Sequence, residues 1–113
     1  MRFDAAGCNP SPAVNNKFVA PANGELIKVF VRATSAPGTT RVSFHKASDG
    51  TTNLNTTGEE IISVNMSAAD TTYTANFTNS SFNAGDILGL SLNPFNTPND
   101  VNVTFVWLFD WTT

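Results

Sequence analysis

Hydrophobic and polar residues alternate along most of this chain with the two-residue period of a β-strand, and the last segment shows the pattern most strongly. Successive side chains of a strand point to opposite faces of its sheet. One face of segment 101–111 is wholly apolar and comprises Val101, Val103, Phe105, Trp107, Phe109 and Trp111. The other face is apolar only at its centre, at Val106 and Leu108. Such a strand lies in a sheet packed on both sides or offers its second face to another subunit.

Five earlier segments alternate in the same way and predict further strands, at 25–33, 41–46, 59–66, 72–78 and 87–92. Glycine, proline and asparagine separate these segments, and no helical period occurs. Six strands with turns between them predict an all-β fold, an antiparallel β-sandwich or jelly roll.

Segment 25–33 has one apolar face and one mixed face. The alternation predicts that the core face comprises Ile27, Val29, Val31 and Ala33. The mixed outer face then comprises Leu26, Lys28, Phe30 and Arg32.

The start of the chain is interrupted by Gly7, Pro10 and Pro12, which exclude a helix and weaken strand pairing. We therefore expect an extended N-terminal arm at residues 1–17, followed by one β-sandwich domain at residues 18–113. A frayed terminus is the alternative. If the arm docks on another protein, its anchoring side chains would be Phe3 and Val14.

The composition narrows the classes of protein. The chain of 113 residues is 41% hydrophobic and 13% charged, so asparagine, threonine and serine must form much of the surface. The six basic residues are scattered in a chain of net charge −3, which argues against nucleic acid as a partner. Neither a secretory signal nor an apolar run of about 18 residues occurs, so we expect a protein made in a host cytoplasm and not held in a membrane.

The side chains capable of catalysis or metal binding are few. His45 is the only histidine and is expected to be exposed on the polar side of its strand, and Cys8 is the only cysteine. No nucleophile motif, metal-ligand set or cofactor motif accompanies them, which predicts a chain that is not an enzyme and binds no cofactor. Asp49 and Asp86, each beside a glycine, are expected to brace turns, with calcium binding as the alternative.

The aromatic residues of the last segment admit two interpretations. Trp107, Phe109 and Trp111 could stack on sugar rings, or they could pack in the core or in a seam between subunits. The shared apolar face favours packing. Trp111, nearest the end of the segment, is the one most expected to be exposed.

Several segments resemble the small trimeric jelly-roll domains of tailed-phage virions. They are Phe-x-Ala-Pro-x-x-Gly-x-Leu at 18–26 with the Val-Phe-Val strand after it, Phe-Asn-Ala-Gly-Asp at 82–86, and the closing aromatic strand. Those domains serve as head decoration or cement proteins and as the globular heads of tail fibres. The resemblance implies a jelly roll, a homotrimer and no catalytic residues.

We therefore expect a virion structural protein that decorates a phage head and attaches to the major capsid protein or another virion protein. A start at its own methionine, with no fibrous shaft, favours a decoration protein over a fibre head. The expected trimer seam comprises Leu26, Phe30, Phe105, Trp107, Phe109 and Trp111. The alternative is a receptor-binding fibre head or a carbohydrate-binding module, with a glycan held by loops 35–40, 49–58 and 94–100.

Overall fold

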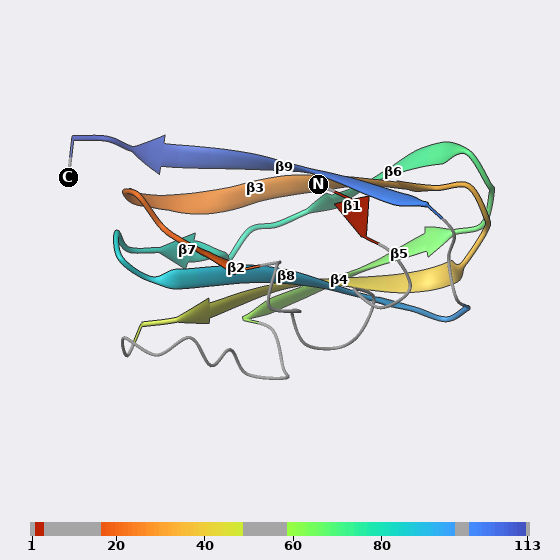
Figure 1. Cartoon of the computed structure of the whole chain (residues 1–113), viewed down its shortest axis with the longest axis horizontal. Helices are drawn as coiled ribbons and strands as arrows, with labels where there is room; N and C mark the ends of the chain where they lie inside the picture. The colour runs from red at the N-terminus through yellow and green to blue at the C-terminus, as the bar shows by residue number, and fades with distance from the viewer. Residues whose placement is uncertain (1, 4–16, 49–58, 97–99, 113) are drawn as a thin grey trace.

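Two antiparallel β-sheets pack face to face in the computed structural model of this chain (Figure 1). The structure describes residues 2–3, 17–48, 59–96 and 100–112, and these residues contain strands and turns but no helix. The predicted all-β sandwich is therefore confirmed. The predicted arm falls mostly outside the described residues, as does its anchor Val14, while Phe3 lies in a two-residue strand.

Each sheet combines strands that are far apart in the sequence. Sheet A has the order β1 (Arg2–Phe3), β9 (Val101–Asp110), β3 (Asn23–Ala33) and β6 (Thr71–Asn76), and β7 (Ser81–Phe82) also pairs with β3. Sheet B has the order β2 (Lys17–Val19), β8 (Ile87–Pro94), β4 (Gly38–Ala47) and β5 (Glu60–Met66). Figure 1 shows β9, β3 and β6 in one layer and β8, β4 and β5 in the other.

The core forms where the inner faces of the two sheets meet. Val29 and Val31 of β3 and Val42 and Phe44 of β4 are each no more than 1% exposed. Burial of one such side chain stabilises the fold by roughly 1.5–3 kcal/mol. The inner positions are therefore enough to hold two sheets together without a disulfide bond.

The wholly apolar face of β9 points into the core. Trp107 lies edge-on to three phenylalanine rings. Measured between ring centroids, it is 5.4 Å from Phe18 of β2 and 6.2 Å from Phe44 of β4. It is 5.6 Å from Phe82 of β7. Edge-to-face aromatic pairs add about 0.5–1.5 kcal/mol each beyond the area they bury. This aromatic cluster therefore joins β9 to strands of both sheets.

A β-bulge in β3 reverses part of the predicted inside-outside pattern. The register between β3 and β9 shifts between Leu26 and Lys28, so Ile27 is an extra residue with no residue of β9 opposite it. Leu26 consequently points inward and is 1% exposed, whereas Ile27 is partly exposed. The predicted faces of these two residues are wrong, because an inserted residue flips every side chain on one side of it.

We predict that Trp107→Ala lowers the free energy of unfolding by about 3–5 kcal/mol, because it removes the centre of the aromatic cluster. Phe95→Ala is the matched control, since it also truncates an aromatic ring but at a side chain that is 81% exposed. Its effect should stay within about 0.5 kcal/mol. Chemical denaturation of the two variants measures both values, and an equal loss would contradict the inward orientation of Trp107.

Candidate functional site

The outer face of sheet A carries apolar side chains on its two central strands, β3 and β9. Val106 and Leu108 alternate with the buried rings of β9 and so point outward, and Leu108 is 58% exposed. Phe30 of β3 also points outward and lies opposite Thr104, the outward-facing residue of β9 next to Val106. We call Phe30, Val106 and Leu108 the outer patch. Lys28 lies opposite Val106, and its ammonium is 5.3 Å from the centre of the Phe30 ring, so one charge lies among these apolar side chains.

Beside Phe30 the same face is hollowed. The hollow has a volume of about 170 Å³ and is lined by Phe30, Val31, Arg32, Thr72, Asn102 and Thr104. Arg32 lies 3.3 Å from the Asp70 carboxylate, and both side chains are exposed. Sheet A therefore presents a protruding leucine and a hollow with a polar rim on one surface.

The residues expected to form a trimer seam are divided between the core and the surface. Leu26 is buried within the single chain and has no surface to offer a neighbour, and Phe105, Trp107 and Phe109 pack against the core. Trp111 follows β9, is 68% exposed as expected, and its ring lies 5.3 Å from that of Phe109.

Sequence reasoning left two residues of the outer patch out of the expected seam. Val106 and Leu108 were visible in the sequence as the apolar centre of the second face of β9. The larger aromatic residues on the first face drew the interface assignment to the face of β9 that packs against the core.

His45 is not exposed as the alternation predicted. Its Nε2 atom lies 2.8 Å from Oγ of Ser91 on the neighbouring strand, and the two residues are 1% and 0% exposed. A serine beside a histidine is the start of a hydrolytic centre, but here neither atom is accessible to a substrate. The pair instead satisfies two polar groups that would be costly to bury alone.

Two carboxylates in the described part of the chain, those of Asp86 and Asp110, brace turns. Asp86 accepts a hydrogen bond from the backbone N–H of Asn83 at 2.9 Å, which confirms its expected role in the 82–86 turn. Asp110 accepts bonds from the hydroxyl and the N–H of Thr112, and these two bonds hold the pKa of its carboxyl below its usual value. Asp49 lies outside the described residues.

Glu60 of β5 fastens sheet B to the turn that leaves β6. Its carboxylate accepts hydrogen bonds from the N–H of Asn79 at 2.7 Å, the hydroxyl of Ser80 at 2.6 Å and the N–H of Thr78 at 3.0 Å. Partial burial acts to raise the pKa of Glu60, but these bonds outweigh it and the pKa lies below its usual value. The role of this carboxylate is structural.

Metal and membrane sites are not evident in residues 2–3, 17–48, 59–96 and 100–112. These residues contain no cluster of three histidine, cysteine, aspartate or glutamate side chains that could hold a metal ion. They also contain no helix long and apolar enough to cross a membrane.

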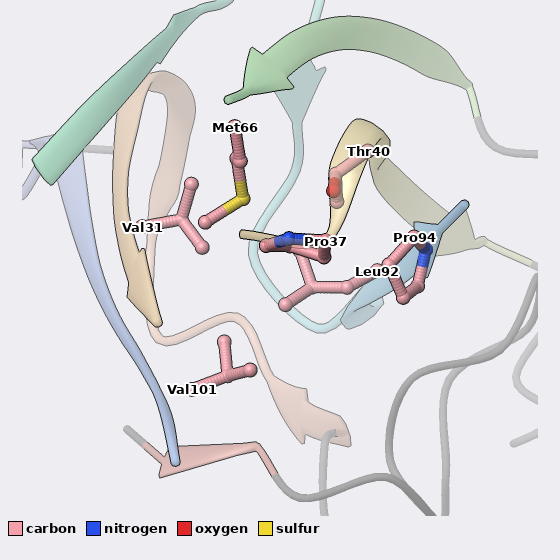
Figure 2. Close-up of a pocket in the computed structure, with 7 residues that line it drawn as sticks. All are labelled: Val31, Pro37, Thr40, Met66, Leu92, Pro94 and Val101. Carbon is pink, nitrogen blue, oxygen red and sulfur yellow. The ribbon is translucent and has the colours of Figure 1, made fainter. Parts of the chain in front are cut away.

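A small cavity lies between the two sheets at one end of the core. Figure 2 shows side chains from both sheets around it: Val31, Pro37, Thr40, Met66, Leu92, Pro94 and Val101. Its volume is about 10 Å³ and its lining is almost entirely apolar. One water molecule needs about that much space together with two or more polar partners. The cavity is therefore a packing defect of the core and not a ligand site.

Comparison with known proteins gives no match to a family model, to a curated protein or to a solved structure. We therefore infer the function from the surfaces described above and from the resemblance of the sequence segments.

We predict that Glu60→Gln lowers the free energy of unfolding at neutral pH by about 1 kcal/mol, a value that allows for partial exposure to solvent. The variant loses the charge and turns an amide NH₂ toward groups that donate hydrogen bonds. Because folding lowers the pKa of Glu60, the carboxylate stabilises the fold above its ordinary pKa of about 4.3, and this contribution is lost as the pH falls through the lower folded-state value.

Denaturation of both proteins from pH 7 down to acid measures the effect. The difference between wild type and Glu60→Gln should shrink as the pH falls. Glu59→Gln is the control, because Glu59 is the exposed neighbour and its side chain makes no hydrogen bond within the described part of the chain. A difference that stays constant with pH would contradict the role of the Glu60 carboxylate.

Proposed function

We propose that this chain is a non-enzymatic structural protein of a virion, a decoration or cement protein that forms a homotrimer on a tailed-phage head. The observation that carries the proposal is the outer patch of Phe30, Val106 and Leu108. The inner face of the same sheet already packs on the core, so the exposed part of these outward apolar side chains is available to another protein. Apolar side chains gathered on the outer face of a sheet are typical of a site of association between proteins.

The strand pairing supports a jelly-roll topology within this proposal. Strand β1 pairs with β9, β2 with β8, β3 with β6, and β4 with β5. A long antiparallel hairpin rolled into two sheets produces this nested set of pairs, as in viral capsid domains. The pairing thus agrees with the resemblance to phage virion domains, which carries the virion assignment.

Self-association is supported by the shape of the outer face of sheet A. Leu108 protrudes near one end of β9, and the hollow beside Phe30 lies toward the other end. When a protrusion and a complementary hollow occupy different places on one surface, copies bind head to tail, and such contacts close into a ring if the rotation permits. Three copies would close the trimer that the resemblance implies.

The uses of the polar side chains also fit a structural protein. His45 and Ser91 bond to each other in the interior, and Glu60 and Asp86 hold turns. In the proposed virion the arm at residues 1–17 attaches the trimer to the capsid shell, with Phe3 and Val14 as its anchors.

We predict that Leu108→Lys converts the trimer to monomers, because it would bury an unpaired charge in the apolar contact. Ile61→Lys is the matched control: Ile61 is also an aliphatic side chain on the outer side of a strand and is 44% exposed, but it lies on sheet B. Light scattering coupled to size exclusion measures the molar mass. A wild type that is monomeric at micromolar concentration, or an unchanged trimer in Leu108→Lys, would contradict the interface.

The virion assignment has its own test. Purified chain is added to empty phage heads that lack a decoration protein, and co-sedimentation and the melting temperature of the heads are measured. We expect binding together with a higher melting temperature, since a ligand of the assembled state stabilises it. Absence of binding by a chain that does form trimers would contradict the decoration role and leave the self-association intact.

A further inference from the structure

The outer face of sheet B has a shallow hollow of about 310 Å³ that the proposed assembly does not use. It is lined by Thr39 and Arg41 of β4, Asn93 and Pro94 of β8, and Phe95 immediately after β8. These residues are close in space because β4 and β8 pair, although they lie some 50 positions apart in the sequence. The hollow is therefore a product of the fold.

The strand register holds the side chains of this hollow in two cross-strand pairs. Arg41 lies opposite Asn93, and the N–H of Phe95 donates to the carbonyl of Thr39 at 3.0 Å, which makes Thr39 and Phe95 the next pair. The buried side chain of Thr40 points to the core, so its neighbours Thr39 and Arg41 point outward. A sheet is a rigid support, so the four side chains have a fixed spacing.

The chemistry of the two pairs is that of a ligand site. Phe95 is 81% exposed, and burial of an aromatic ring would be favourable, so the exposed ring is a platform available for contact. Arg41 is exposed, and within the described part of the chain neither its guanidinium nor the Asn93 amide makes a hydrogen bond or ion pair. One cation, one amide, one hydroxyl and one flat apolar ring thus surround a single hollow.

We propose that this hollow binds an acidic monosaccharide, a sugar ring that bears a carboxylate. The planar guanidinium of Arg41 matches a carboxylate with two parallel hydrogen bonds. The apolar face of the sugar ring covers the Phe95 ring, and the sugar hydroxyls bond to the Asn93 amide and the Thr39 hydroxyl. A volume near the lower end of the range for small-molecule sites suits one ring.

Other anions fit the hollow less well. A phosphate-rich polymer requires several cations, whereas this hollow has one and the chain has a net charge of −3. A simple carboxylate would use Arg41 and leave the Phe95 platform uncovered. The site lies on sheet B, on the other side of the sandwich from the outer patch, so the inference does not depend on the proposed assembly.

Saturation-transfer NMR with millimolar sugars tests the site. The probes are glucuronic acid, galacturonic acid and N-acetylneuraminic acid, with glucose and galactose as neutral counterparts and acetate as the carboxylate alone. We expect signal transfer to at least one acidic sugar, with affinity at least about 10-fold above that for its neutral counterpart or for acetate, as loss of a charged bidentate contact implies.

Variants of the full chain locate the contact. Arg41→Gln and Phe95→Ala should each weaken binding by about 10-fold or more, while Arg32→Gln, a matched loss of charge on sheet A, should leave it unchanged. Thermal unfolding confirms that each variant is folded. Absence of transfer to every acidic sugar, equal binding of acidic and neutral sugars or acetate, or unchanged binding by Arg41→Gln would overturn the proposal. None of these outcomes bears on trimer formation.

Discussion

The packing of the aromatic face of β9 against sheet B is the contact on which the rest of this structure depends. Trp107 is at its centre and contacts rings from β2, β4 and β7. Large rings gain most when they leave water, so this face and not the other becomes the inner one. Because side chains alternate along a strand, the inward orientation of the aromatic face turns Val106 and Leu108 outward. The inner contact thus creates the surface available for assembly.

The alternation of the sequence was sufficient to predict strands, two sheets and a sandwich, because a strand with one buried face must show a two-residue period. It was not sufficient to place Leu26 and Ile27. Both residues are apolar, so the bulge between β3 and β9 leaves no mark on the hydrophobic pattern. The seam residues were ambiguous for a related reason. The pattern shows that Phe105, Trp107 and Phe109 face away from water, but it does not show whether their own chain or another covers them, and in the structure they pack against their own core.

The polar positions were harder to predict from sequence than the apolar ones. His45 lies on the outer side of its strand, as its polarity suggested, yet it is buried and bonded to Ser91. The alternative glycan site at loops 35–40 and 94–100 included Thr39 and Phe95 of the sheet B hollow, but Arg41 and Asn93 join them only once β4 and β8 pair in their observed register. The two outer faces offer different chemistry: sheet A presents apolar side chains, and sheet B presents a cation beside an exposed ring.

Acrylamide quenching of tryptophan fluorescence tests most directly whether the closing strand turns its aromatic face inward. The chain has two tryptophans, so Trp111→Phe leaves only Trp107 and Trp107→Phe leaves only Trp111. The structure predicts a blue-shifted, weakly quenched emission from Trp107 and a red-shifted, strongly quenched emission from Trp111, which is 68% exposed. Equal quenching of the two in the folded proteins would contradict the account.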